Sequence, residues 1–308
     1  SGGKWMMTGW LVVNGFLQSA KFDELIQLFC EAADRLQVRL QVIRNSECLV
    51  KLGNQNDREE ESLWEQKDKP DFVIFWDKDI LLANYLESMG VPVYNSSDSI
   101  AVCDDKRKTH LVLHRAGIPM PQTLLSPMTY NNIGYPDIEF LDQVESALTY
   151  PMVIKEAFGS FGEQVYMAQN REQMEQIVQT AGSHELIFQQ FIISSRGRDL
   201  RLQVVGDRVT GAMYRYSETD FRANITAGGH MRMYQPSDEE IRLAVCAAKA
   251  VGCDFAGVDL LFGENGPVAC EVNSNAHFKN LMDCCGINTA EEILHYVVQQ
   301  SERDRCRG

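Results

Sequence analysis

The chain has 308 residues, 44% hydrophobic and 23% charged, which is enough for two or three packed lobes. Its formal net charge of −14 argues against a nucleic-acid partner, because a strongly acidic surface repels a phosphate backbone. No uninterrupted apolar run approaches the roughly 20 residues of a membrane-spanning helix, so no membrane partner is expected.

The nine cysteines are scattered and form no CxxC pair or Cys/His metal spacing. The N-terminus has no charged-then-apolar secretion signal, and Ser1-Gly2-Gly3 resembles the remnant of a cleaved tag. An odd number of cysteines without a signal predicts free thiols and a cytoplasmic location.

Strands and helices alternate over the first hundred residues. Strands are predicted at residues 10–14, 38–43, 72–76 and 91–94, and helices at 22–36 and 81–89. Residues 54–70 are polar and charged, as in a loop or an exposed insert. The alternation predicts a parallel sheet with helices on its faces, and we assign it to an N-terminal α/β domain over residues 1–100.

The pattern changes after residue 100. Helices are predicted at 106–116, 172–181 and 237–251, and strands at 150–156, 186–193, 200–205, 209–216, 255–259 and 267–273. Gly117 ends the first of these helices, and Ser237 with Glu240 forms a capping box for the last. The last third is therefore predicted to be an antiparallel sheet backed by helices.

Three oxygen-bearing side chains end two neighbouring strands. Asp259 closes the first strand, and Glu271 and Asn273 close the second, where alternation points both to one face. Two carboxylates and an amide oxygen are hard ligands of the kind that Mg²⁺ uses beside nucleotide phosphates. The alternative is a solvated, charged strand end.

Other segments offer groups for an anionic ligand. Lys155 ends an apolar strand, and Ser160 and Gly162 lie in the glycine-containing segment that follows, whose backbone could approach phosphate. Gln189 and Gln190 end another strand, where they could read an adenine. An ordinary hairpin turn and a plain strand fit the same patterns.

Several arginines stand out in so acidic a chain. Arg201, Arg215 and Arg222 lie near glycines and suit phosphate or carboxylate through bidentate hydrogen bonds, with surface salt bridges as the alternative. His277, close to the end of the Asn273 strand, is a candidate substrate contact. No GxSxG signature is present, which argues against an acyl-enzyme hydrolase.

With these pieces in order, residues 100–300 resemble the RimK-type amino-acid ligases of the ATP-grasp superfamily. The resemblance is carried by Asp105-Lys106, by the strand ending at Lys155, by Gly197-Arg198-Asp199-Leu200-Arg201, by Phe221-Arg222-Ala223-Asn224 and by the Asp259, Glu271 and Asn273 set. It implies an ATP-grasp fold of mixed α/β class. A central lid (101–190) and a C-terminal antiparallel-sheet domain (191–308) would follow the N-terminal domain.

The resemblance also implies the roles of individual residues. The nucleotide would be bound by Lys106, Lys155, Ser160, Gly162, Gln189, Gln190, Phe191, Ile192, Asp199, Arg222, Ala223 and Asn224. Arg222, Arg201 and Arg215 would act in catalysis, Asp259, Glu271 and Asn273 would hold Mg²⁺ (with Mn²⁺ as an alternative), and Asn275 and His277 would contact substrate. The chain departs from the family at Gln190, where a glutamate is usual, and at residues 274–280, which lack the proline-glycine of ribosomal-protein glutamate ligases.

The implied reaction is ATP-dependent ligation. ATP phosphorylates a carboxylate, and an amine attacks the acyl phosphate to give an amide, ADP and phosphate. Glutamate or another amino acid would be joined to a peptide, a protein C-terminus or a metabolite, and the enzyme would be a homo-oligomer, either a dimer or a tetramer. The alternatives are an ATP-binding protein with a regulatory or non-ligase role, and a different ATP-grasp reaction such as a kinase or carboxylase-type step.

Overall fold

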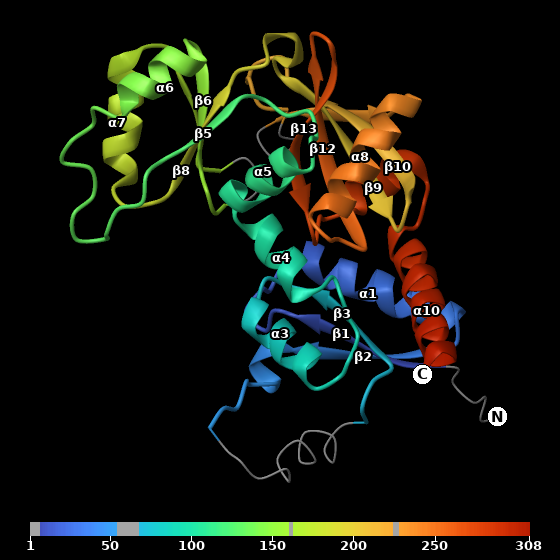
Figure 1. Cartoon of the computed structure of the whole chain (residues 1–308). Helices are drawn as coiled ribbons and strands as arrows, with labels where there is room; N and C mark the ends of the chain where they lie inside the picture. The colour runs from blue at the N-terminus through green and yellow to red at the C-terminus, as the bar shows by residue number, and fades with distance from the viewer. Residues whose placement is uncertain (1–6, 54–67, 160–162, 224–227) are drawn as a thin grey trace.

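Three β-sheets organise the chain in the computed structural model, which describes residues 7–53, 68–159, 163–223 and 228–308 (Figure 1). A four-stranded sheet near the N-terminus lies at the bottom of the view in Figure 1. A second four-stranded sheet forms the lobe at upper left, and a five-stranded sheet forms the lobe at upper right. The mixed α/β architecture expected from the sequence is confirmed.

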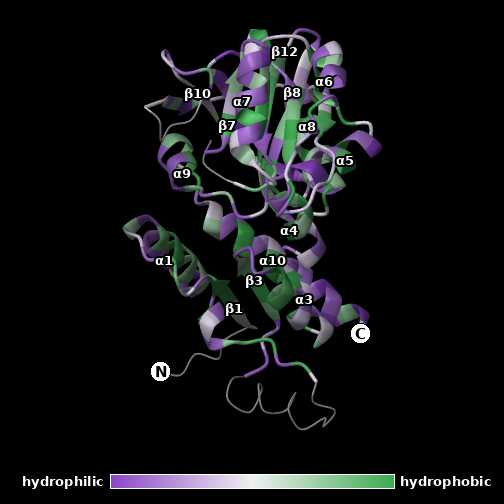
Figure 2. Ribbon diagram, turned by 90° about the vertical axis from the view of Figure 1, so that its left-hand side faces the viewer, coloured by the Kyte–Doolittle hydropathy of each residue, from purple (hydrophilic) through white to green (hydrophobic). Residues whose placement is uncertain are grey.

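The N-terminal sheet is parallel throughout, as the alternation of strands and helices predicts. Its strand order is β2-β1-β3-β4. The strands and flanking helices are β1 (Met7–Val13), α1 (Ala20–Arg35), β2 (Val38–Arg44), β3 (Phe72–Trp76), α3 (Ile80–Ser88) and β4 (Val93–Tyr94). Every residue of β3 is buried, which fits a strand covered on both faces, and Figure 2 shows the hydrophobic colour along β1 and β3.

The last helix of the chain packs on this first sheet. Helix α10 (Thr289–Arg307) lies beside α1 in Figure 1, and its residues Ile293, Leu294 and Val297 share a core with Leu25 and Phe29 of α1. Helix α10 is not among the elements predicted from the sequence. The division at residues 100 and 190 therefore stays a proposal, with α10 as a C-terminal element that completes the N-terminal lobe.

Helices α4 (Ser97–Asp104) and α5 (Lys106–Arg115) lead into the central lobe. Its sheet has the order β5-β8-β6-β7 and is antiparallel, with α6 and α7 contributing to one core. Its elements are β5 (Thr123–Leu125), α6 (Leu141–Leu148), β6 (Met152–Glu156), β7 (Val165–Ala168), α7 (Arg171–Ala181) and β8 (Leu186–Gln190). Strand β8 ends three residues earlier than predicted, because residues 193–195 form a short 3-10 turn.

The C-terminal sheet has the order β11-β10-β9-β12-β13 and is antiparallel, as predicted. It comprises β9 (Arg198–Val205), β10 (Arg208–Tyr216), β11 (His230–Met233), β12 (Phe255–Gly263) and β13 (Gly266–Asn273), with α8 (Asp238–Ala250) and α9 (Lys279–Cys285). The predicted Ser237/Glu240 capping box begins α8. Leu200 and Leu202 on β9 pack in one core with α8 residues, so the side chains between them point to the opposite face.

Two further expectations concern the chain as a whole. No disulfide joins any of the nine cysteines, all of which lie in the described ranges. Among the described residues, no helix is both long and apolar enough to cross a membrane. The polar segment 54–70 lies mostly in the undescribed range 54–67.

Candidate active site

The face of the C-terminal sheet away from α8 carries charged residues in register. Asp259 on β12 lies between Arg201 on β9 and Glu271 on β13, and is the cross-strand partner of both. Asp199 is likewise paired with Arg215 on β10. Residues from four adjacent strands, far apart in sequence, thus form one charged surface.

Two arginines enclose the Asp259 carboxylate. Arg201 binds it through two nitrogens, one of them at 3.1 Å, and Arg215 Nη2 lies 3.2 Å from Asp259 Oδ2. Arg215 also binds Asp199 in a bidentate pair at 2.7 and 2.8 Å. Burial opposes ionisation of Asp259, but the charges of Arg201 and Arg215 outweigh it and lower the pKa of Asp259. This carboxylate is therefore held as an anion.

The second carboxylate of the predicted metal site faces a lysine. Lys155, at the end of β6, is 6% exposed, and its Nζ lies 3.9 Å from Glu271 Oε1 and 3.5 Å from Cys270 Sγ. Burial opposes the charge on Lys155, but Cys270 and Glu271 together raise its pKa. The Asn273 amide donates to the carbonyl of Gly257 at 3.4 Å, and its oxygen is the remaining acceptor.

The second predicted lysine begins helix α5, directly after the N-cap Asp105. Lys106 Nζ donates to the Gly159 carbonyl at 2.8 Å, and its backbone N–H donates to Ala157. Burial and the charge of Lys155 lower the pKa of Lys106, against the opposing charge of Glu271. The structure thus brings both lysines to the start of the glycine-containing segment. Ser160 and Gly162 in that segment lie outside the described residues.

The predicted adenine-binding strand end is arranged differently from a plain solvent edge. Gln189 is buried, and its amide nitrogen lies 2.9 Å from His110 Nε2 and 3.0 Å from Thr123 Oγ1. Gln190 is exposed, and its backbone N–H donates to Gln122. The Gln189 side chain therefore holds the strand from inside the lobe rather than facing solvent.

The residues that follow Gln190 are partly exposed. Phe191 makes an edge-on contact with Phe221, with ring centroids 6.5 Å apart, and Arg196 stacks over Phe191. The carbonyl of Ile192 accepts a hydrogen bond from the backbone of Ser195 and closes the 3-10 turn. Phe191 thereby connects the strand end to the segment that contains Arg222.

The third predicted arginine lies apart from the Asp259 network. Arg222 forms a bidentate pair with Asp220 at 2.8 and 3.1 Å, and stacks over the Phe221 ring. Its side chain is 32% exposed, against 14% for Arg201 and for Arg215. Ala223 is buried, and Asn224 lies outside the described residues.

The predicted substrate residues lie between β13 and α9. His277 is next to the backbone of Lys21 at the start of α1, and burial lowers its pKa. Its Nε2 is buried and has no hydrogen-bond partner among the described residues. Asn275 is half-buried. This segment therefore faces the N-terminal lobe, so a ligand touching His277 would also approach α1.

Sequence reasoning missed two side chains at the site. Cys270 reaches Lys155 because the ladder shifts by one residue between Asp259 and Leu260, which leaves residue 270 unpaired, and no local signal reveals such a bulge. His110 Nε2 accepts a hydrogen bond from the Gln189 side-chain amide. Its Nδ1 hydrogen-bonds to the Lys106 carbonyl at 2.7 Å. Its spacing, one helical turn after Lys106, was the available signal.

The oxygen atoms at the predicted metal site are ligands of the kind that Mg²⁺ prefers. Asp259, Glu271 and Asn273 offer hard oxygens from two paired strands. Within the described ranges, no group of three or more His, Cys, Asp or Glu side chains is placed to hold a metal ion, so a site here depends on the Asn273 amide. Four cations, Lys106, Lys155, Arg201 and Arg215, outnumber the three carboxylates of Asp199, Asp259 and Glu271. The excess positive charge favours an anionic ligand.

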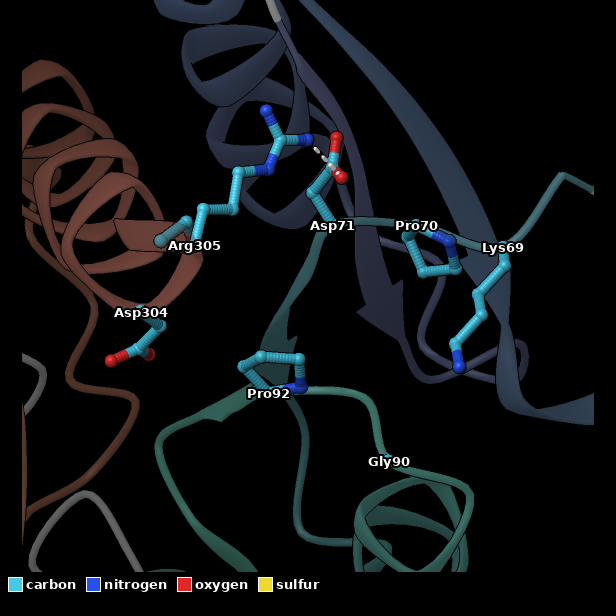
Figure 3. Close-up of a pocket in the computed structure, with 8 residues that line it drawn as sticks. Lys69, Pro70, Asp71, Gly90, Pro92, Asp304 and Arg305 are labelled. Carbon is cyan, nitrogen blue, oxygen red and sulfur yellow. Dashed lines mark hydrogen bonds and ion pairs between the residues drawn. The ribbon is translucent and has the colours of Figure 1, made fainter. Parts of the chain in front are cut away.

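A separate pocket lies at the other end of the N-terminal sheet. It has a volume of about 340 Å³ and is lined by residues that precede β3 and β4 and by the end of α10. Figure 3 shows Arg305 paired with Asp71, while Asp304 points away from that pair. None of the predicted site residues lines this pocket.

The arrangement of the three sheets is found in a solved ligase whose crystal structure contains ATP. The structure superposes on D-alanine–D-alanine ligase from Bacillus anthracis with a TM-score of 0.70, 17% identity and coverage of 98% of this chain and 99% of that one. Residues 103–297 match the model of the RimK-like ATP-grasp domain. The chain belongs to this RimK-like family and is an ADP-forming ligase, a class that uses ATP with Mg²⁺.

Two sequence relatives support the same placement. The chain is 37% identical over 214 residues to a probable alpha-L-glutamate ligase 2 of Shewanella amazonensis, covering 68% of each chain. It is 33% identical over 227 residues to beta-citrylglutamate synthase B of Danio rerio, covering 72% of this chain and 54% of that protein.

Proposed function

We propose that this ligase joins an amino acid, glutamate in the first instance, to a carboxylate acceptor through an acyl-phosphate intermediate. The observation that carries the proposal is the convergence of Asp259 and Glu271 with Arg201, Arg215 and Lys155 on one sheet face. The names of the two relatives, a glutamate ligase and a citrylglutamate synthase, support glutamate as the amine.

Positioning and charge neutralisation would supply most of the rate enhancement, because phosphoryl transfer asks little covalent chemistry of the protein. Lys106 and Lys155 would neutralise the α and β phosphates. Asp259, Glu271 and Asn273 would hold Mg²⁺, with Mn²⁺ as an alternative ion. The bound metal would neutralise charge on the β and γ phosphates.

The three arginines would have different roles, in accordance with how exposed each side chain is. Arg222, the most exposed, would stabilise the transferred phosphoryl group and the acyl phosphate. Arg201 and Arg215 are held by Asp259 and Asp199, so they would balance the negative charge of these carboxylates until nucleotide and metal bind. A ribose contact from Asp199 would require its pair with Arg215 to open.

Adenine would bind beside Gln190, Phe191 and Ile192, with Gln189 fixing this strand end from inside. Ser160, Gly162, Ala223 and Asn224 would contribute to phosphate and nucleotide contacts.

The acceptor is proposed as a peptide, a protein C-terminus or a metabolite acid. Asn275 and His277 would contact it, since their segment lies where the C-terminal sheet meets α1. A dimeric or tetrameric assembly and a cytoplasmic location remain predictions, which sedimentation and cell fractionation would test.

A screen of ADP release with each amino acid and pooled carboxylate acceptors, followed by mass spectrometry of the product, tests this function. We expect ADP release that depends on both an amino acid and an acceptor. ATP binding without ADP release across the whole panel would favour the regulatory alternative. Phosphate release without an amide would favour a different ATP-grasp reaction.

A further inference from the structure

A buried asparagine of the N-terminal lobe contacts the strands that carry the proposed metal ligands. Asn95 directly follows β4 and is 0% exposed. Its side chain reaches the start of β12 and the residue after β13, which are 159 to 179 positions away in the sequence.

The Asn95 amide is fully hydrogen-bonded. Its Oδ1 accepts the backbone N–H groups of Asp254 at 2.7 Å and Phe255 at 3.2 Å, and its Nδ2 donates to the carbonyls of Phe255 and Ser274, both at 2.9 Å. The reversed amide orientation would set donors against donors and acceptors against acceptors, so only this orientation satisfies all four bonds.

The Asn95 side chain takes the place of the backbone pairing that would continue the β12–β13 ladder. The β12–β13 ladder ends with Gly257 opposite Asn273, and continuing it would put residue 275 opposite Phe255. The Asn95 amide instead binds both backbone groups of Phe255. Strand β13 therefore leaves the sheet directly after Asn273, and Asn95 fixes the carbonyl of Ser274 at the point of departure.

We propose that Asn95 is a positioning residue for the Mg²⁺-binding end of the site, an inference that rests on the proposed function. By holding Ser274, it sets the direction of Asn273 at the end of β13 and of the following segment with Asn275 and His277. Partners that orient metal ligands typically change metal affinity 10- to 100-fold when removed.

Tyr296 offers a matched control. Its hydroxyl donates to Asp254 Oδ1 at 2.6 Å, so it also links another element to the segment before β12, but it makes no bond to Ser274. Tyr296→Phe removes one partly buried hydrogen bond near β12 and leaves the end of β13 untouched. A general loss of stability would affect this variant as well.

The test is the Mg²⁺ dependence of ATP binding, measured by titration calorimetry on the full chain in wild type, Asn95→Asp and Tyr296→Phe. Asn95→Asp keeps the oxygen that accepts two N–H groups but turns an acceptor toward the carbonyls of Phe255 and Ser274. We expect its half-saturating Mg²⁺ concentration to rise about 10-fold or more. Tyr296→Phe should stay within about 2-fold of wild type.

A wild-type Mg²⁺ response in folded Asn95→Asp, or an equal rise in Tyr296→Phe, would overturn the inference. If Asn95→Asp does not fold, as judged by its melting curve, Asn95→Ser provides the same reading with one donor retained and is expected to show a smaller rise. ATP binding by wild type that ignores Mg²⁺ would instead refute the proposed function, and with it the inference.

Discussion

The N-terminal and C-terminal sheets use their strand faces differently. Strand β3 of the N-terminal sheet is apolar and buried at every position, between helices on both sides. Strand β9 of the C-terminal sheet buries Leu200 and Leu202 against α8 and turns Asp199 and Arg201 to the other face. The first sheet is a stable support, and the second carries the charges.

The charged face of the C-terminal sheet is less favourable for stability than the apolar N-terminal sheet. Largely buried charges lose hydration, and removing one partner of a buried ion pair typically costs about 3–5 kcal/mol. The Asp199–Arg215–Asp259–Arg201 network is therefore a demanding arrangement for stability alone. Its position beside Glu271 and Lys155 indicates that the network serves the function of the site.

The largest effect is expected at the charged face. Asp259→Asn removes a proposed metal ligand and leaves Arg201 without its carboxylate, so ADP release should fall by roughly 10²–10³-fold or more. Stability should fall as well.

Glu271→Gln separates the two effects, because Glu271 is 29% exposed and faces only Lys155 at 3.9 Å among its ion pairs. It should lose activity with a smaller loss of stability than Asp259→Asn, because Lys155 loses a partner at 3.9 Å whereas Arg201 loses a carboxylate that it binds through two nitrogens. Near-normal ADP release in both variants would contradict the metal site.

The opposite behaviour is expected from the apolar sheet. Phe72→Ala on β3 empties a fully buried position and should lower the free energy of unfolding by about 3–5 kcal/mol. The Mg²⁺ dependence of the remaining folded protein should not change. Leu81→Ala, at a position that is 77% exposed in the same lobe, is the control and should cost less than about 0.5 kcal/mol. A shift of the Mg²⁺ response in Phe72→Ala would show that the N-terminal sheet also affects metal binding.

A pH effect is expected where the central lobe meets the site. Burial lowers the pKa of His110 from 6.5 to about 4, near the charges of Lys106, Lys155 and Glu271. Between these values the unfolded chain binds a proton that the folded chain does not, so the free energy of unfolding falls as the pH falls from 6.5 toward 4. The loss from this residue is of order 3 kcal/mol.

His110→Gln removes this titration, so denaturant unfolding at several pH values should show a shallower dependence in the variant. Parallel curves for wild type and variant would contradict the neutral state of His110 that its bonds to Lys106 and Gln189 indicate.

The smallest effect is expected at the distant pocket of Figure 3. Arg305 is 52% exposed and pairs with Asp71, so Arg305→Ala should cost less than about 1 kcal/mol and leave ADP release unchanged. Thermal melting and the ligase assay measure both. A loss of activity would show that the N-terminal sheet contributes to function from its far end.

The sequence predicted the charged site better than the contacts between lobes. Alternation along β13 was enough to place Glu271 and Asn273 on one face, because this period is a local property of a strand. The strand end predicted at Asp259 is wrong, since β12 continues to Gly263. Helix α10 was missed although Ile293, Leu294 and Val297 have helical spacing. The surface that covers its apolar stripe, α1, lies more than 250 positions earlier.

Asn95 and Cys270 lay beyond sequence reasoning for similar reasons. The partners of Asn95 are backbone groups from distant strands, which no spacing rule reveals. Cys270 reaches Lys155 through a register shift that depends on how β12 and β13 pair. The inward turn of Gln189 likewise follows from the packing of α5 against β8 rather than from its own segment.

The charged site is proposed to make an amide at the expense of ATP. Mass spectrometry of the reaction with glutamate, ATP, Mg²⁺ and pooled carboxylate acceptors tests it most directly, with ADP measured in the same samples. We expect an acceptor that gains one amino-acid residue for each ADP formed, and no product from Glu271→Gln. ADP formed without any amide, or a full yield of amide from Glu271→Gln, would contradict it.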